Sequence, residues 1–187
     1  MMNKYPTIFS SGKEVDLPAM LNARDERVHF QRALLGKITK EDNYSLLVMT
    51  MAIPGPIKTN DILNKAFDYM VNHVKESKND LAILHELKRE EYTGYEYYIL
   101  SSLSPREMKE FAVDIEETHP LGRLFDIDVL KLNDKNEIEG TSRTQLGLPI
   151  RRCFICNESA KDCGRSRRHS VEELQTEISQ QILSYFE

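Results

Sequence analysis

Two aspartates, Asp126 and Asp128, lie two positions apart in an otherwise mostly apolar segment from Leu121 to Leu130. Alternate side chains of a β-strand share a face, so both carboxylates would point the same way, about 7 Å apart. Such a pair is costly beside apolar neighbours unless a cation neutralises it, and hard oxygen ligands favour Mg²⁺. We predict that Asp126 and Asp128 are catalytic and bind the metal. Solvated acids on an exposed edge strand are the alternative.

Positive charge is concentrated late in the chain. Between Arg143 and Arg168, seven basic residues stand against two acidic ones, although the whole chain has a formal net charge of -5. A local basic patch in an acidic protein suits a compact anion such as a polyphosphate. The acidic total argues against a surface built as a whole to bind nucleic acid.

Two further segments could contact an anion. Pro54 to Lys58 contains a glycine that permits close backbone approach, and it precedes a helix predicted from Asn60, whose first N–H groups are unpaired. A rigid turn with a surface lysine is the other interpretation. Arg24 and Arg27 fall on one side of a predicted N-terminal helix, where they form either a second wall of a pocket or a solvated polar stripe.

Three cysteines and a histidine could bind a soft metal. Cys153, Cys156, Cys163 and His169 lie within 17 positions and could close a tetrahedral Zn²⁺ site. The spacing after Cys156 is irregular for a zinc knuckle, and buried reduced cysteines are the alternative. Three cysteines cannot all pair with one another, and a cytosolic chain would keep them reduced. His169 could instead act as a base or contact a phosphate.

The elements that position these residues follow from caps and periodicity. Capping boxes begin helices at Ser104 and Ser170, and a short turn around Thr93 and Gly94 predicts a hairpin. The predicted helices are about 18–35, 60–74, from 104 to before Pro120, and 170 to the C-terminus; the predicted strands are 45–53, 81–90, 95–102 and 123–132. Helices that alternate with strands favour an α/β or α+β domain, with a mixed sheet and flanking helices.

Composition indicates one globular domain. The chain has 187 residues, of which 40% are hydrophobic and 29% charged, so we expect a single domain over residues 1–187, with a basic Cys/Arg-rich segment at about 140–169. No apolar run approaches the roughly 20 residues that span a bilayer. The first six residues lack the apolar core of a signal peptide. We therefore expect a cytoplasmic protein with no membrane partner.

Four segments together resemble the apo-citrate lyase phosphoribosyl-dephospho-CoA transferase family. They are Ala23–Arg27, Pro54–Lys58, Gly122–Val129 and the stretch from Arg151 to His169. The likeness covers nearly the whole chain, in order and at matching length. The combination of these motifs is specific, although each motif alone is not.

The resemblance implies a citrate lyase holo-acyl-carrier-protein synthase with a nucleotidyltransferase-like fold. Such enzymes take 2'-(5''-triphosphoribosyl)-3'-dephospho-CoA and attach its phosphoribosyl-dephospho-CoA part to a serine of the citrate lyase acyl carrier subunit, releasing pyrophosphate. Mg²⁺ at Asp126 and Asp128 would stabilise the departing pyrophosphate, and Asp114, Glu116 and Glu117 are candidates for a third acid. The residues expected to hold the donor are Lys58, Arg123, Arg151, Arg152, Arg165, Arg167, Arg24 and Arg27.

Three other functions stay open at this point. The nearest is transfer of the same group to the malonate decarboxylase carrier. Another is a metal-dependent nucleotidyltransferase that acts on a different acceptor. The third is a zinc-stapled RNA-binding module without catalysis, against which weigh the acidic total and the absence of aromatic residues interleaved with the basic run.

Overall fold

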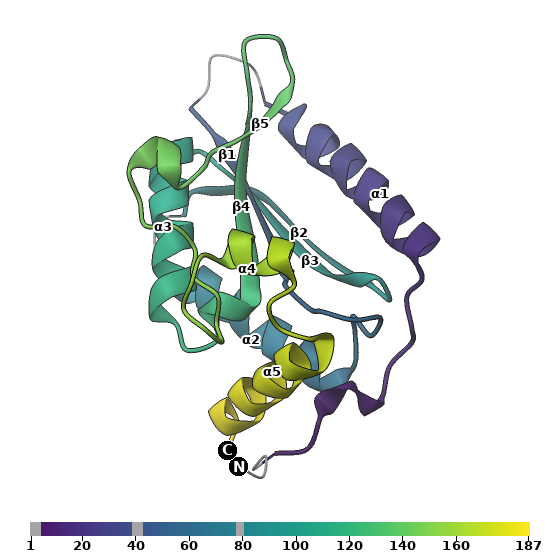
Figure 1. The fold of residues 1–187 in the computed structure, drawn as a ribbon. Helices are drawn as coiled ribbons and strands as arrows, with labels where there is room; N and C mark the ends of the chain where they lie inside the picture. Colours follow the sequence, from purple (N-terminus) through teal and green to yellow (C-terminus); the bar gives the residue numbers. More distant parts are fainter. Residues whose placement is uncertain (1–4, 39–42, 78–80) are drawn as a thin grey trace.

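A five-stranded sheet in the order β2-β3-β1-β4-β5 forms the centre of the computed structural model, which describes residues 5–38, 43–77 and 81–187 (Figure 1). The strands are β1 (Ser45–Met51), β2 (Ile83–Glu91), β3 (Gly94–Ser101), β4 (Phe125–Leu132) and β5 (Ile138–Gly140). The helices are α1 (Leu17–Leu35), α2 (Asp61–Ser77), α3 (Pro105–Thr118), α4 (Ala160–Ser166) and α5 (Val171–Tyr185). The first six residues were predicted to lack the apolar core of a signal peptide, and residues 1–4 of these lie outside the described part of the chain.

The layered arrangement of helices and sheet is confirmed, but the pairing of the strands differs from the predicted mixed sheet. Every strand pairing in the described residues is antiparallel. α2 connects β1 to β2, which run in the same direction, but β3 lies between them. α3 likewise connects β3 to β4, with β1 between them. Each helical connection therefore passes over one strand, and no two parallel strands become neighbours.

Helices cover both faces of the sheet. On one face, α2, α3 and α5 bury residues such as Phe67, Met108 and Ile178 against the odd-numbered side chains of β1, β3 and β4. On the other face, Leu34 and Leu35 of α1 join a smaller cluster of even-numbered strand residues. Figure 1 shows α1 lying along this side, apart from the other helices. Among the described helices, none combines the length and apolar character needed to cross a membrane.

Most of the predicted elements are confirmed. Ser104 and Ser170 both form complete capping boxes, and Gly36 ends α1. The predicted hairpin joins β2 to β3 with Glu91 opposite Gly94. The structure adds β5 and α4, which the sequence did not reveal, because β5 has three residues and α4 has seven, of which only Cys163 is buried. Neither element carries a readable hydrophobic period.

The strand with the two acids has the predicted alternation. In β4, Phe125, Ile127 and Val129 are buried, whereas Asp126 and Asp128 are exposed on the opposite face. Gly122 sets the entry to this strand, because a Cβ atom there would meet the carbonyl oxygen of Ile115 at 2.2 Å. Only glycine therefore allows the turn before β4 to pack so closely against α3.

Candidate active site

The two predicted catalytic residues share a small pocket beside α3, here called the acid pocket. Its volume is about 250 Å³. It is lined by Lys109, Glu116, Asp126, Asp128, Arg143 and Arg151, together with residues 140–142. The acid pair therefore lies among a third, buried carboxylate and several cations, which the strand motif alone did not predict.

Two side chains of α3 hold the backbone of Ile127, the residue between the two acids. The Ile127 N–H donates a 2.9 Å hydrogen bond to Glu116 Oε1, and Lys109 Nζ donates a 2.8 Å hydrogen bond to the Ile127 carbonyl. β5 pairs with β4 only from Leu130 onward, so this part of the β4 edge has no neighbouring strand among the residues that the structure describes. α3 takes the place of that strand and thereby fixes both acids.

The charges in the acid pocket are only partly balanced. Burial raises the pKa of Asp128, and the neighbouring Asp126 carboxylate raises it further, although part of the Asp128 residue is exposed to solvent. Burial lowers the pKa of Lys109, while Glu116 opposes that change. A divalent cation between the two acids would remove the repulsion that raises the Asp128 pKa, so the donor set fits Mg²⁺.

Arg151 connects the acid pocket to a larger one. Its Nη1 donates a 2.7 Å hydrogen bond to Asp126 Oδ1, and its Nη2 donates to the carbonyls of Arg123, at 3.1 Å, and Phe125. These bonds fix the guanidinium at the start of β4. Arg151 lines both pockets, so a ligand that binds in the larger pocket would reach the acids past this side chain.

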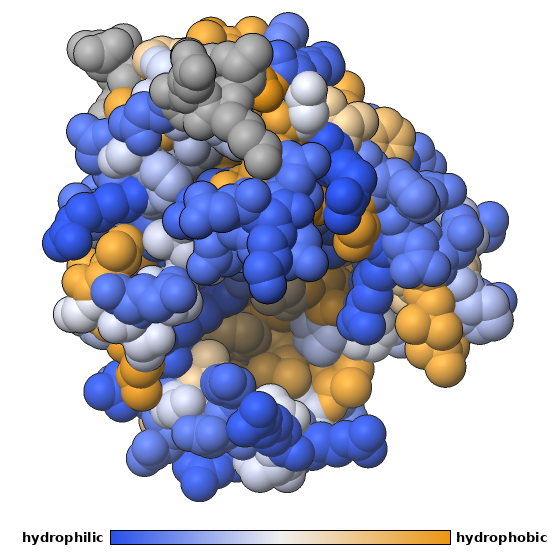
Figure 2. Space-filling view, turned by 90° about the horizontal axis from the view of Figure 1, so that it is seen from above, coloured by the Kyte–Doolittle hydropathy of each residue, from blue (hydrophilic) through white to orange (hydrophobic). Residues whose placement is uncertain are grey.

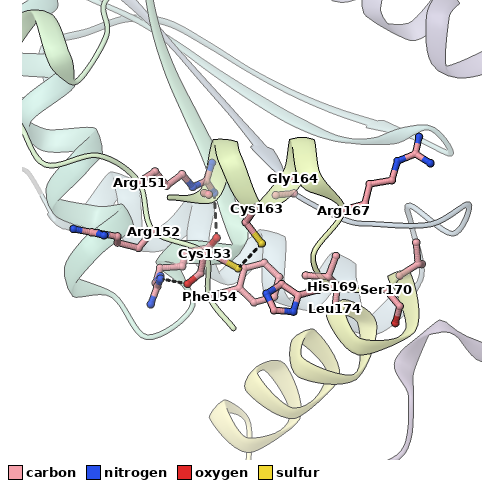
Figure 3. Close-up of a pocket in the computed structure, with 14 residues that line it drawn as sticks. Arg151, Arg152, Cys153, Phe154, Cys163, Gly164, Arg167, His169, Ser170 and Leu174 are labelled. Carbon is pink, nitrogen blue, oxygen red and sulfur yellow. Dashed lines mark hydrogen bonds between the residues drawn. The ribbon is translucent and has the colours of Figure 1, made fainter. Parts of the chain in front are cut away.

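The larger pocket, here called the apolar pocket, has a volume of about 540 Å³. Ala52, Phe154, Val171 and Leu174 give it apolar surface, and four arginines border it: Arg123, Arg151, Arg152 and Arg167. In Figure 3, Arg151 and Arg152 lie on one side of the central cysteines and Arg167 lies on the other. The pocket therefore combines an apolar interior with flanking anion-binding groups, which suits a ligand with both apolar and phosphate parts.

The surface of the molecule shows the same combination. The face in Figure 2 is hollowed near its centre, where hydrophobic residues are visible inside the hollow and hydrophilic residues surround it. Such a hollow favours an amphipathic ligand over a small, fully polar one.

The Cys₃His cluster, defined as Cys153, Cys156, Cys163 and His169, borders the apolar pocket, and all of its members except Cys156 line it. The four ligand atoms lie within 4.8 Å of one another, and the group could bind a metal ion. All three cysteines are free thiols. The facing His169 side chain, together with the Glu158 backbone, lowers the pKa of Cys156 to about 6.

The segment from Pro54 to Lys58 lies beside α5. Gly55 has a φ of +81°, a backbone conformation that favours glycine, and it lies against the Gln175 side chain. Lys58 Nζ donates a 2.6 Å hydrogen bond to the Ile53 carbonyl. Burial lowers the pKa of Lys58, and the positive charge of Arg24 lowers it further. The structure thus brings Lys58 and Arg24 together, but neither lines the apolar pocket.

Two other predicted donor-binding residues are placed differently. Arg27 Nε donates a 2.8 Å hydrogen bond to Glu96, a buried acid that also pairs with Arg89 at 2.8 Å. Arg27 therefore has a partner that ties α1 to the sheet. Arg165 is exposed on α4 and lines neither the acid pocket nor the apolar pocket.

The sequence did not indicate that Lys109, Glu116 and Arg143 would line the same pocket. Arg143 is buried and pairs with both Glu116 and Glu117. One signal was present, because Lys109 and Glu116 are seven residues apart and so share a face of α3. A charged pair on a face next to the apolar stripe indicates buried polar contacts.

Comparison with known proteins shows which family the chain resembles. The family model described as apo-citrate lyase phosphoribosyl-dephospho-CoA transferase matches residues 15–185. A probable apo-citrate lyase phosphoribosyl-dephospho-CoA transferase of Streptococcus pyogenes serotype M18 (strain MGAS8232) is 44% identical over 178 residues, which cover 95% of this chain and 91% of that protein. The Escherichia coli O1:K1 / APEC protein of the same family name is 33% identical over 168 residues, 89% and 87% of the two chains. The Haemophilus influenzae protein CitXG is 32% identical over 180 residues, which cover 95% of this chain but only 37% of CitXG.

Proposed function

Since this chain belongs to the apo-citrate lyase phosphoribosyl-dephospho-CoA transferase family, we propose that it transfers phosphoribosyl-dephospho-CoA from 2'-(5''-triphosphoribosyl)-3'-dephospho-CoA to a serine of the citrate lyase acyl carrier subunit. The observation that carries the site assignment is Arg151, which lines both pockets and bonds to Asp126. A donor with an apolar part and a triphosphate needs both environments side by side.

The apolar pocket is proposed to receive the dephospho-CoA part of the donor. Phe154, Val171 and Leu174 offer apolar contacts for its base or pantetheine arm, and Arg123, Arg152 and Arg167 offer charge-assisted hydrogen bonds to its phosphates. Lys58 and Arg24, which lie close together, would add positive charge at the periphery. Arg27 and Arg165 are the weakest members of the predicted set, because one is paired with Glu96 and the other lies outside both pockets.

The triphosphate is proposed to extend from the apolar pocket to the acid pocket. Arg151 would exchange its bond to Asp126 for phosphate oxygens as the donor enters, which leaves Asp126 free. The serine Oγ then attacks the α-phosphorus, an O–P bond forms, and the bond to the β-phosphate oxygen breaks to release pyrophosphate. The serine proton passes to a carboxylate or to water.

Asp126 and Asp128 are proposed to hold Mg²⁺. When bound, the ion would supply positive charge for the oxygens of the departing pyrophosphate. Asp114, Glu116 and Glu117 were the candidates for a third acid, and of these Glu116 lines the acid pocket. Its carboxylate is already engaged by the Ile127 N–H and by Arg143, so we assign it to positioning the strand.

Residues 1–187 are proposed to act as one transferase domain in the cytoplasm. One sheet carries both hydrophobic clusters, and the acid and apolar pockets share Arg151.

The direct test is to incubate the protein with the triphosphoribosyl donor, Mg²⁺ and the apo acyl carrier subunit, and to weigh the carrier by mass spectrometry. The expected result is a mass gain equal to phosphoribosyl-dephospho-CoA, with release of pyrophosphate. A parallel reaction with the malonate decarboxylase carrier tests the acceptor. No gain on the citrate lyase carrier by a folded protein would refute the proposal.

A further inference from the structure

The Cys₃His cluster forms part of one wall of the apolar pocket, and we propose that it binds a structural Zn²⁺ ion that holds this wall together. Cys153 and Cys156 come from the loop after Arg152, Cys163 comes from α4, and His169 directly precedes Ser170, the N-cap of α5. Three separate pieces of chain would therefore share one ion. Four protein ligands and no open position are typical of a structural zinc site.

The distances between the sulfur atoms fit a shared zinc ion. Cys163 Sγ lies 3.5 Å from Cys153 Sγ and 4.0 Å from Cys156 Sγ. Tetrahedral zinc with Zn–S bonds of about 2.3 Å places two sulfur atoms about 3.8 Å apart. A disulfide would require about 2.05 Å and would leave one of three thiols unpaired. The observed spacing therefore matches ligands that surround an ion.

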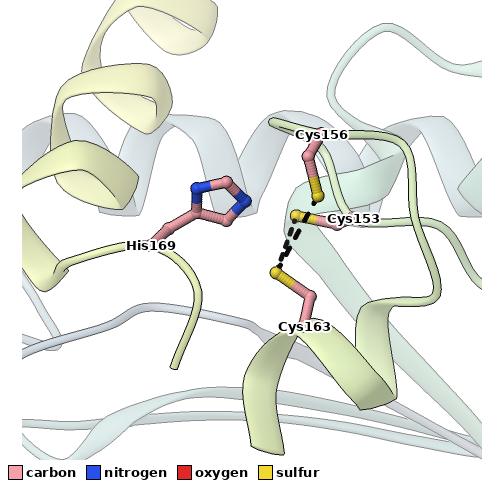
Figure 4. Close-up of side chains that lie close together, drawn as sticks. All are labelled: Cys153, Cys156, Cys163 and His169. Carbon is pink, nitrogen blue, oxygen red and sulfur yellow. Dashed lines mark hydrogen bonds between the residues drawn. The ribbon is translucent and has the colours of Figure 1, made fainter. Parts of the chain in front are cut away.

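The histidine supplies an independent observation. His169 Nε2 is buried and has no hydrogen-bond partner in the part of the chain that the structure describes. A buried polar atom without a hydrogen-bond partner destabilises the fold. Figure 4 shows the imidazole facing the three sulfur atoms. A bond from this nitrogen to zinc would satisfy it.

The local backbone is shaped to present the first two ligands. Asn157 has a φ of +59° and donates its N–H to the Cys153 carbonyl at 3.1 Å, while the Cys153 N–H donates to the Glu158 carbonyl at 2.7 Å. This tight turn brings Cys153 and Cys156 to the same side. The short helix that follows buries only Cys163, so a metal would provide the cohesion that a hydrophobic core provides elsewhere.

The ion would also position the pocket arginines, an effect that rests on the proposed function. Arg123 Nη2 donates to the Cys153 carbonyl, and Arg152 is next to Cys153 in the chain. Zinc would thus fix the loop that presents Arg151 and Arg152 to the donor. Loss of zinc should therefore weaken donor binding, although no zinc ligand belongs to the acid pocket.

The test is to purify the wild-type chain with reductant and without chelator, and to measure its metal content by mass spectrometry. We expect one zinc ion per chain, thiols that react with a thiol reagent only after chelation, and, after cobalt replacement, the absorption of tetrahedral thiolate-bound cobalt. Cys163→Ser and His169→Ala should lose most of the zinc, whereas His85→Ala, an exposed histidine on β2, should keep it.

Wild-type protein that contains no zinc, takes up none, and has three reactive thiols or a disulfide would overturn the proposal. Cobalt that shows no thiolate band would do the same without any variant. The two proposals can fail separately. A zinc-loaded chain that transfers nothing would refute only the proposed function, whereas a chain that transfers fully but neither contains nor takes up zinc would refute only the zinc site.

Discussion

The buried carboxylate of Glu116 accepts a 2.9 Å hydrogen bond from the backbone N–H of Ile127. Ile127 separates the two acids of β4, so an acid of α3 fixes the centre of the acid pocket. The second carboxylate oxygen of Glu116 accepts from Arg143. The spacing of the acid pair therefore depends on a helix and a loop that lie outside the strand itself.

Glu116→Ala should lower the free energy of unfolding by about 3 kcal/mol, because it leaves the buried Arg143 guanidinium partly unpaired and the Ile127 N–H without an acceptor. The matched control is Glu110→Ala, which breaks the exposed pair with Arg106 and should cost at most about 1 kcal/mol. Urea denaturation measures both. Equal losses of unfolding free energy in the two variants would contradict this role of Glu116.

Asp126→Asn and Asp128→Asn should each reduce transfer at least about 100-fold while the protein stays folded, because the change removes a charge but keeps the shape. Carrier modification followed by mass spectrometry gives the rate, and circular dichroism checks the fold. The control is Glu139→Gln, a half-buried acid on β5 that pairs with Lys131 and lines no part of the acid pocket, and it should transfer normally. Full Mg²⁺-dependent transfer by either aspartate variant would refute the assignment.

The raised pKa of Asp128 predicts how stability changes with pH. Between its unfolded and its higher folded value the folded chain binds more protons, so stability falls as pH rises through that window. Without metal, Asp128→Asn should be more stable than wild type at neutral pH and lose this advantage below about pH 4. Added Mg²⁺ should stabilise wild type much more than the variant. Thermal melts across pH test this, and an advantage independent of pH would contradict it.

Arg167 and Arg165 provide a test of the apolar pocket. Both belong to the basic segment, but only Arg167 lines the pocket. Arg167→Ala should raise the KM for the donor about tenfold or more, in line with loss of a charge-assisted hydrogen bond, and Arg165→Ala should change it little. Steady-state kinetics at varied donor concentration separates the two, and equal effects would indicate a diffuse electrostatic contribution.

His119 should make the protein sensitive to acid. Its Nδ1 accepts a 3.1 Å hydrogen bond from the Leu121 N–H, which requires the neutral ring. Burial lowers its pKa, and His73 lowers it further, so the unfolded chain binds more protons and stability falls as pH drops below about 6.5. His119→Gln should flatten this dependence in urea denaturation, and His85→Gln should not. The same slope in both variants would refute the assignment.

The sequence by itself determined the elements whose signals are local. The capping boxes at Ser104 and Ser170, the hairpin before Gly94 and the alternation around Asp126 each depend on residues within one turn or one strand. Such contacts form between neighbours in the chain, so spacing alone predicts them. The resemblance to the family could be recognised from the sequence for the same reason, because each motif is a short stretch of neighbouring residues.

Tertiary structure decided which of the predicted residues meet. Arg151 reaches Asp126 across 25 positions, and Arg27 pairs with Glu96 across 69. Spacing along the chain does not encode such contacts, because they depend on how α1, α3 and the Cys/Arg-rich loop pack against the sheet. The antiparallel pairing has the same origin, since β3 and β1 insert between strands that a helix connects. The acids of β4 were visible in the sequence, but the contacts from α3 that position them form only in the folded chain.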